Sequence, residues 1–259
     1  ANGTISADYC RLGNCTAMLS GGKATNSDDR GGNVNWNFIS GLMWTGAAGD
    51  NLWSNGENWF GNQPPTAQDT VVFGPASAVN CILDISDTVT GILFTGEYTG
   101  VFNFSDQTLC VKGNADFRSG GSFLRALGSS LRFIGDGAQS FTPRAGSAFP
   151  DIVQDGTGAT TIRLNNLSAG NLTVERGSLD LGIGLTHTVA GVSGTGSITF
   201  GSSILNAAGA IVSFRDFEGI NAGTGSLRFS GKSPQTFIPS QNHLHPAILQ
   251  TGTETTKIG

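Results

Sequence analysis

One sequence motif occurs twice in this 259-residue chain, and the repetition limits what the chain can fold into. The first copy, LRFIGDGAQSFTP, starts at Leu131, and the second, LRFSGKSPQTFIP, starts 96 residues later at Leu227. Extended without a gap, the windows Gly128–Arg163 and Thr224–Gly259 agree at 15 of 36 positions. The shared residues are mostly apolar, turn-forming or amide-bearing, as a recurring backbone path requires. We therefore expect the same structural element twice.

Apolar and polar residues alternate with period two around both copies. In GNLTVERGSLDLG, Leu172 and Val174 alternate with polar residues, and after a break at Gly177 so do Leu179 and Leu181. Period two is typical of strands, because successive side chains point to opposite faces. The 39 glycines fit many tight turns, since glycine adopts the positive φ that such turns need. No stretch shows a capped 3.6-residue stripe, so we predict an all-β protein with almost no helix.

The repeat favours a right-handed parallel β-helix, a β-solenoid in which one coil uses roughly 20–30 residues. A 96-residue unit would then form about four coils, with matched glutamines stacked as ladders between neighbouring strands. Both Leu-x-Phe strands, Leu131–Phe133 and Leu227–Phe229, should point Leu and Phe inward. Tandem β-sandwiches remain the alternative fold. The predicted segments are 1–41, the end of a preceding β-coil region; 42–127, a Trp-rich entry region with the first coils; 128–223, the first repeat unit; and 224–259, a truncated second unit.

The charge balance and hydropathy exclude two classes of partner. A net charge of −5 and a pI near 5.0 argue against nucleic acid, which requires a basic face. The chain also has no apolar run of the roughly 18 residues that a membrane helix needs.

The four cysteines predict an oxidising, extracellular location, because their number is even and they lack paired C-x-x-C spacing. Cys10 and Cys15 could close a small loop, which leaves Cys81 and Cys110 as the second disulfide by elimination. The alternative is that all four are free thiols.

A tryptophan-rich region precedes the repeats: WTGAAGDNLWSNGENWFGNQPPTAQDTVVF, which ends in the predicted strand Thr70–Phe73. The W-T-G…W…N-W…P-P…D-T-V-V-F pattern resembles repeats associated with autotransporter passengers and other large bacterial surface proteins. The Q-x-F-x-P units that follow also resemble β-helical repeats of such extracellular proteins. The resemblance covers most of the chain after Leu42. It implies a β-helical fold at the cell surface and no catalytic residue that could be transferred to this chain.

The same tryptophans have two interpretations. Trp44, Trp53 and Trp59 could stack on sugar rings as a carbohydrate-binding row, since an indole offers a large apolar face with a polar N–H. We favour the other interpretation, in which they form a local core or cover the end of the solenoid.

No catalytic constellation is visible. His243 and His245 could face the same way and hold a metal, but the first repeat has Ser147 and Phe149 in their places, so we predict no metal site. Calcium is the candidate cofactor. Its oxygen ligands would come from Asp28, Asp29 and Asn33 or from Asp50, Asn51 and Asn55. The alternative is that these side chains cap turns. Paired carboxylates for glycoside cleavage cannot be singled out. The repeated Arg132 and Arg228 are expected to be exposed strand residues.

We therefore expect a non-enzymatic stalk, adhesin or fibre segment of a large secreted or cell-surface protein. The expected partners are further repeats or copies of the same protein, and glycans are considered as well. A carbohydrate-binding module and a polysaccharide lyase or hydrolase on a β-helix are the alternatives. Because Gly259 ends the matched window, we expect either a fragment of a longer repeat protein or a self-assembling subunit.

Overall fold

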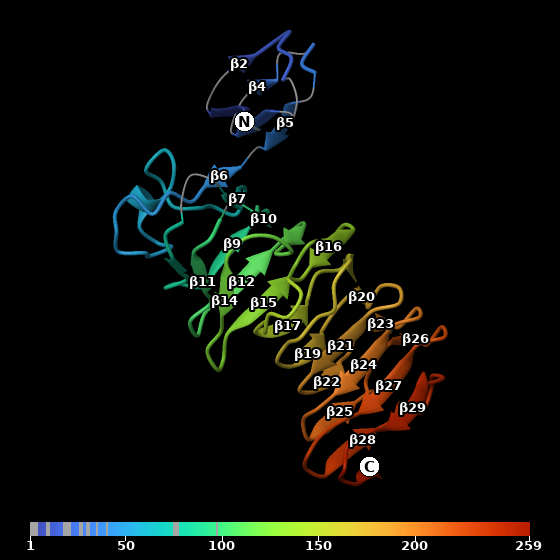
Figure 1. The fold of residues 1–259 in the computed structure, drawn as a ribbon. Coiled ribbons are helices and arrows are strands. Elements are labelled where there is room, and N and C mark those ends of the chain that lie inside the picture. Colours follow the sequence, from blue (N-terminus) through green and yellow to red (C-terminus); the bar gives the residue numbers. More distant parts are fainter. Residues whose placement is uncertain are drawn as a thin grey trace.

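The computed structural model of the chain describes residues 5–8, 11–17, 22–25, 28–29, 32–34, 36–39, 41–74, 78–96 and 98–259. The fold is all-β, with 42% of residues in strands, and its parallel sheets stack as a β-solenoid of about nine turns. This confirms the predicted parallel β-helix. Figure 1 shows the strands following one another in sequence order along the solenoid, from β6 near one end to β28 and β29 at the other. Helix in the described residues is limited to the single turn η1 (Gly56–Asn58), so none of it could span a membrane.

Three sheets form the faces of the solenoid, and each complete coil contributes to all three. Face 1 contains β6 (Leu42–Met43), β7 (Thr70–Phe73), β10 (Gly91–Phe94), β13 (Ala115–Asp116), β16 (Gln139–Thr142), β18 (Ala159–Ile162), β20 (Ser178–Asp180), β23 (Ser197–Thr199) and β26 (Gly219–Asn221). Face 2 contains β9 (Asp87–Val89), β12 (Thr108–Val111), β15 (Ser130–Phe133), β17 (Asp151–Gln154), β19 (Leu172–Val174), β22 (Val192–Gly194), β25 (Ile211–Ser213), β28 (Gln235–Ile238) and β30 (Thr256–Ile258).

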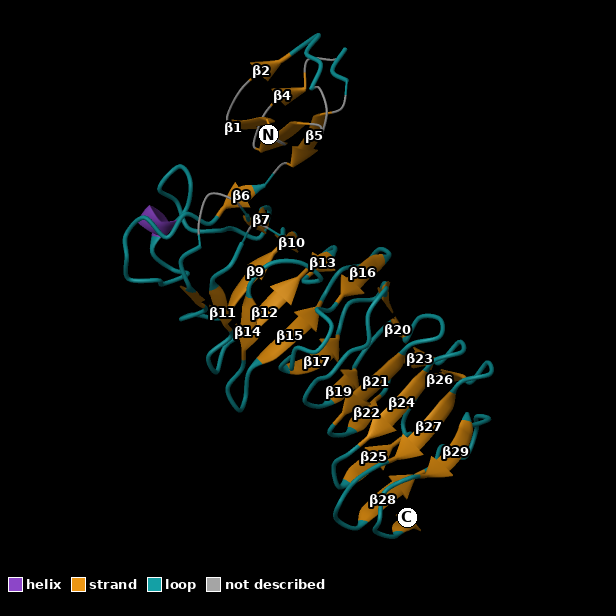
Figure 2. Ribbon diagram, viewed as in Figure 1, coloured by secondary structure: helices purple, strands orange, loops and turns teal. Residues whose placement is uncertain are grey.

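Face 3 consists of two smaller sheets, one of three strands and one of four. It begins with β8 (Cys81–Ile82), β11 (Val101–Asn103) and β14 (Ser122–Leu124), and it ends with β21 (Thr186–Val189), β24 (Ile204–Ala207), β27 (Ser226–Phe229) and β29 (Ala247–Gln250). Single bridges from Ala148 to Ser168 and from Ser168 to Thr188 connect the two parts. Figure 2 shows how loops at the corners separate these short strands.

The strands near the N-terminus form two small parallel sheets of their own. One contains β1 (Ile5–Asp8), β3 (Gly22–Thr25) and β5 (Trp36–Ile39), and the other contains β2 (Arg11–Leu12) and β4 (Asp28–Asp29). The predicted segment boundaries at 41, 127 and 223 stay predictions.

Coil length varies along the stack. Register partners in neighbouring coils are 18 residues apart at Thr186 and Ile204, and 29 residues apart at Leu42 and Val71, where the tryptophan-rich loop lies within the coil. All named strand pairs are parallel. Residues that point inward in one coil therefore pair in register with residues that point inward in the next coil, and the same holds for outward positions.

The interior is a continuous apolar column. Phe73 and Phe94 stack with ring centroids 4.5 Å apart and planes 7° apart, and Phe117 continues the stack at 5.1 Å from Phe94. Leu131, Phe133, Leu227 and Phe229 are all fully buried, which confirms their predicted inward orientation. In an extended strand alternate side chains point to the same side, and the strand SLRF has its Leu and Phe at the inward positions in both copies.

The two copies of the motif lie on different faces, which corrects the estimate of four coils per unit. β15 lies on face 2, whereas β27 lies on face 3. Four turns lead from β15 through β17, β19 and β22 to β25, and the chain then passes β26 on face 1 before it reaches β27. The 96-residue offset therefore spans four turns and two further faces. The motif encodes a strand, a corner and a second strand, and the same local path occurs at two different corners of the solenoid.

The matched glutamines do not stack as amide ladders. In the first copy Gln154 donates from Nε2 to the carbonyl oxygens of Gly156 (2.9 Å) and Gly158 (3.2 Å), while Thr160 donates to its Oε1 (2.6 Å). In the second copy Gln250 makes the matching contacts with Gly252, Glu254 and Thr256. The Gln154 and Gln250 amides thus each bind the corner that follows their own strand. The two copies lie several coils apart, so their amides cannot contact each other.

Candidate functional site

The three tryptophans form an aromatic cap at the start of the core. Trp44, Trp53 and Trp59 are at most 1% exposed, and Trp59 meets the other two edge-on at centroid distances of 5.1 and 4.8 Å. Phe73 packs against all three, which connects the cap to the phenylalanine column. The longest coil therefore supplies the apolar cover of this end of the core.

Every indole N–H of the cap is hydrogen-bonded inside the protein. Trp44 donates to the Val79 carbonyl (3.1 Å), Trp53 to Asp87 Oδ2 (2.6 Å) and Trp59 to the Trp53 carbonyl (2.7 Å). Sugar stacking needs an indole face open to solvent, and none of the three offers one. The structure therefore does not place these residues in a carbohydrate-binding row, and the packing is that of a core cap.

The Asp50 loop is organised by hydrogen bonds that donate toward the carboxylate. Asp50 accepts from Asn55 Nδ2 (2.6 Å), from Asn58 Nδ2 (2.5 Å) and from the Leu52 amide (3.0 Å). These donors, Asn55 first, lower the pKa of Asp50. Both carboxylate oxygens face N–H groups, so the loop has the turn-capping arrangement and is not a cage of oxygen ligands.

The other calcium candidate is only partly described. Asp28 and Asp29 form β4, but their side chains lie outside the described part of the chain. Asn33 accepts from the Cys15 amide (3.0 Å) and donates to the Leu12 carbonyl (2.9 Å), so its side chain links backbone segments. Over the described residues, no three His, Cys, Asp or Glu side chains gather as metal ligands would.

The two histidines of the second copy both contact Ser240. His245 has the place that Phe149 has in the first copy, and its half-buried ring lies 5.9 Å from Phe214 and 5.5 Å from Phe237, beside the aromatic core. His245 Nε2 bonds to the Ser240 carbonyl (3.1 Å), and His243 Nδ1 bonds to the Ser240 hydroxyl (3.0 Å). His245 therefore substitutes for a core phenylalanine.

The described cysteines are free thiols. Cys81 is fully buried on face 3, whereas Cys110 points outward from β12 on face 2, beside Thr88 and Arg132 in the neighbouring strands. The predicted Cys81–Cys110 disulfide is therefore not formed, since one side chain faces the core and the other faces away from it. Cys15 is also a free thiol, and its predicted partner Cys10 lies outside the described residues.

The repeated arginines have different surroundings. Arg132 forms ion pairs with Asp155 (2.6 Å) and Glu175 (2.8 Å), and these carboxylates belong to the next two coils. At Arg228 the atom Nε is buried without a hydrogen-bond partner within the described structure. Thr251 replaces Asp155 at the position matched to it in the second copy.

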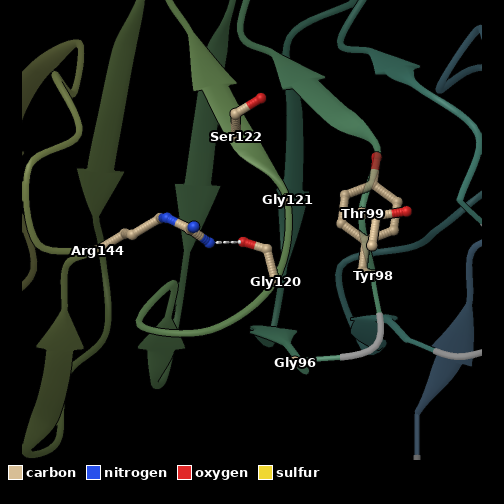
Figure 3. A pocket seen from close by; sticks show the side chains of 7 residues that line it. All are labelled: Gly96, Tyr98, Thr99, Gly120, Gly121, Ser122 and Arg144. Carbon is tan, nitrogen blue, oxygen red and sulfur yellow. Dashed lines mark hydrogen bonds between the residues drawn. The ribbon is translucent and has the colours of Figure 1, made fainter.

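Two surface depressions lie on the described part of the solenoid. The first, of about 410 Å³, lies at a corner lined by Tyr98, Thr99, Ser122 and Arg144 (Figure 3). Arg144 donates to the Gly120 carbonyl, and Tyr98 donates to the Val79 carbonyl (3.0 Å). Burial raises the pKa of Tyr98, so its phenol stays protonated. The Tyr98 donor and one Arg144 donor of this lining are thus already in use, and the described lining contains no carboxylate.

The second depression, of about 450 Å³, crosses β7, β10, β13 and β16 on face 1. Asp116 is the one carboxylate among its described lining residues, and it pairs with Arg118 at 3.0 Å. Asn114 accepts from the Ser140 amide and hydroxyl, both at 2.9 Å. Glycoside cleavage uses two carboxyl groups flanking the bond, which this groove does not provide.

β29 and β30, the last two strands of this sequence, expose large apolar side chains. Each strand is the last in its sheet order, so neither has a neighbour on the outer side within the described structure. Ile248 and Ile258 are 45% and 79% exposed, although their register partners Leu227 and Phe237 are buried. In the first copy the matched strand β17 is followed by a further paired strand, β19.

Sequence reasoning missed one buried functional group. His187, on β21, accepts from the Leu167 amide at Nδ1 (3.0 Å) and bonds to the Leu181 carbonyl through Nε2 (2.8 Å). Burial lowers the pKa of His187. The available signal was its place in the alternating run THTV, where the histidine and the valine share a face.

Comparisons with known proteins give this chain no relatives. No protein-family model, no curated protein and no solved structure matches it. The resemblance to autotransporter-associated repeats therefore rests on the quoted sequence patterns alone.

Proposed function

We propose that this chain is a structural segment, a stalk, adhesin or fibre piece, of a large secreted or cell-surface repeat protein of the autotransporter-passenger type. The proposal rests on which residues are identical in the two repeat copies and on where these residues lie in the solenoid. Matched apolar residues such as Phe133 and Phe229 point inward, and matched glutamines hold corners. Residues on the outer surface mostly differ, as at Asp155 and Thr251.

This distribution is the one that duplication for length produces. In a solenoid each coil contacts mainly its neighbours, so stability is roughly the sum of coil and interface contributions. A duplicated binding site would instead keep its outward chemistry, because ligands contact the outer surface. The buried tryptophan cap, whose indole N–H groups all bond inside the protein, supports the same proposal.

Polysaccharide turnover and glycan-array assays of the 259-residue chain test this role. Of the two depressions, the groove on face 1 is the one that contains a carboxylate. The matched variants are therefore Asp116→Asn in the groove and Asp106→Asn on an exposed turn. We expect no turnover and no glycan selectivity with any of the three proteins. Turnover or glycan binding that Asp116→Asn abolishes and Asp106→Asn preserves would replace the structural role with a carbohydrate-directed one.

A further inference from the structure

The corner depression beside Tyr98 contains one charged side chain among its described lining residues, that of Arg144. Arg144 is partly buried and extends from its own coil to the coil before, where it donates to the Gly120 carbonyl (Figure 3). No ion pair between described residues includes Arg144. Its guanidinium is therefore held in position by a hydrogen bond, while its charge is not neutralised by any carboxylate in the described structure.

Two exposed hydroxyl groups belong to the same lining. Ser122 begins β14, and Thr99 lies just before β11 in the coil before. Neither hydroxyl makes a hydrogen bond within the part of the chain that the structure describes, and the amides of Thr99 and Gly120 have no acceptor there either. Guanidinium, hydroxyl and amide groups can all donate to oxygen atoms, so the lining suits a ligand that carries negatively charged oxygens.

The second repeat copy shows that the corner does not require an arginine. Pro143 and Pro239 match, but the next residue is Arg144 in the first copy and Ser240 in the second. Ser240 is 7% exposed, and its hydroxyl contacts His243 (3.0 Å) within its own turn. The turn after the motif therefore forms with either residue, so the backbone path does not account for the charge at Arg144.

The depression has the size of a small-molecule site. Its volume of about 410 Å³ lies within the range of roughly 300–1,000 Å³ that is usual for ligand pockets. An inorganic anion would leave much of this space empty, so there is room for an organic body beside the charged group. Because the chain as a whole carries a net charge of −5, attraction for an anion must come from these local donors.

We propose that this depression binds a small hydroxylated organic acid through its carboxylate or phosphate group. The Arg144 guanidinium and the Ser122 hydroxyl hold the charged group, and the Thr99 hydroxyl binds a hydroxyl of the ligand body. A planar guanidinium presents parallel N–H groups that match two oxygens of either a carboxylate or a phosphate. The site is partly open to water, so we expect a dissociation constant of roughly 1–10 mM. This binding goes beyond the proposed structural role and involves no turnover.

Titrations of the intact 259-residue protein at low ionic strength test the site. The probes are glycerol 3-phosphate and gluconate, one for each kind of charged group. Glycerol and sodium chloride are the matched controls, because the first lacks the charge and the second lacks the oxygens. Nitrogen-15 NMR should show saturable shifts of the Gly120, Gly121 and Ser122 amides with at least one of the two acids, and none with either control at equal ionic strength.

Four variants locate the contact. Arg144→Gln keeps an N–H donor for the Gly120 carbonyl but removes the charge, and it should bind at least about tenfold more weakly. Arg144→Lys keeps the charge without the planar donor pair and should bind roughly three- to fivefold more weakly. Arg215→Gln removes an equal charge at an exposed position of another coil and should bind like the native chain. Ser122→Ala should bind roughly two- to fivefold more weakly, and the fold should be unaffected because the hydroxyl is exposed.

Three results would overturn the proposal. Shifts that are the same for glycerol and glycerol 3-phosphate would remove the role of the charged group. Native affinity in both Arg144→Gln and Ser122→Ala, with the fold checked by circular dichroism, would remove the site. Shifts that spread over the outer surface and do not saturate would assign the effect to ionic strength alone. The turnover and glycan assays depend on Asp116 in the groove on face 1, which lies outside this depression, so the two proposals can fail separately.

Discussion

Gln139 and Gln235 make the same three hydrogen bonds on two different faces of the solenoid. Gln139 accepts from the Gly135 amide (3.0 Å) and donates to the carbonyls of Val111 (3.1 Å) and Gly113 (3.0 Å) in the preceding coil. Gln235 accepts from the Gly231 amide (2.9 Å) and donates to the carbonyls of Ala207 (3.0 Å) and Gly209 (2.7 Å). Each buried amide therefore joins its own corner to the corner beneath it.

The first prediction concerns this amide. Gln139→Ala should lower the free energy of unfolding by about 3 kcal/mol, because it leaves buried backbone donors and acceptors unpaired. Urea denaturation followed by circular dichroism measures the effect. The control is Gln63→Ala, at an exposed position, which should change stability by less than about 0.5 kcal/mol. A Gln139→Ala protein as stable as this control would contradict the assigned role.

The second prediction concerns the aromatic cap. Trp53→Ala should cost about 3–5 kcal/mol, since a fully buried indole leaves a cavity against Trp59 and Phe73. Limited proteolysis should then cut the cap loop first. Phe60→Ala, at a ring that is 40% exposed, is the control and should resist proteolysis like the native chain. Equal resistance of both variants would mean that the cap does not protect the core end.

The third prediction is a loss of stability in acid that depends on His187. Because burial lowers the folded-state pKa of His187 below the ordinary 6.5, the unfolded chain binds a proton more readily than the folded chain. This contribution is fully present above pH 6.5 and is lost as the pH falls, by up to about 1.4 kcal/mol per pH unit until the folded-state pKa is reached.

Urea unfolding at pH 8, 7, 6 and 5 measures this slope. His187→Gln should be less stable throughout and should show a shallower fall between pH 7 and pH 5. The exposed control variant Gln63→Ala should keep the native slope. An unchanged slope in His187→Gln would contradict the assignment.

The fourth prediction concerns thiol reactivity. Burial raises the pKa of Cys81 well above its ordinary value, so the native chain should not alkylate there until it unfolds. Cys110 is half-buried and should alkylate faster than Cys81, although its pKa is also raised by burial. Peptide mapping after timed iodoacetamide treatment gives both rates. A Cys81–Cys110 disulfide found in the native protein would contradict the geometry of both strands.

The sequence by itself determined the strands, the corners and the inward positions. Period-two alternation places Leu131 and Phe133 on one face of a strand wherever that strand lies, and the second copy repeats the pattern at Leu227 and Phe229. These properties are local, because they depend on neighbours within a few residues, and the repeat made them visible without any structure.

Only the tertiary structure decided how the coils are phased and which residues meet. Coil lengths of 18 to 29 residues accumulate, so the face that receives β27 depends on every corner before it. Packing between the coils likewise buries Trp53 and directs the side chains of Cys81 and Cys110 to different sides of the wall. Whether a residue is buried depends on the segment that packs over it. In a solenoid that segment is the next coil, about 20 residues further along the chain.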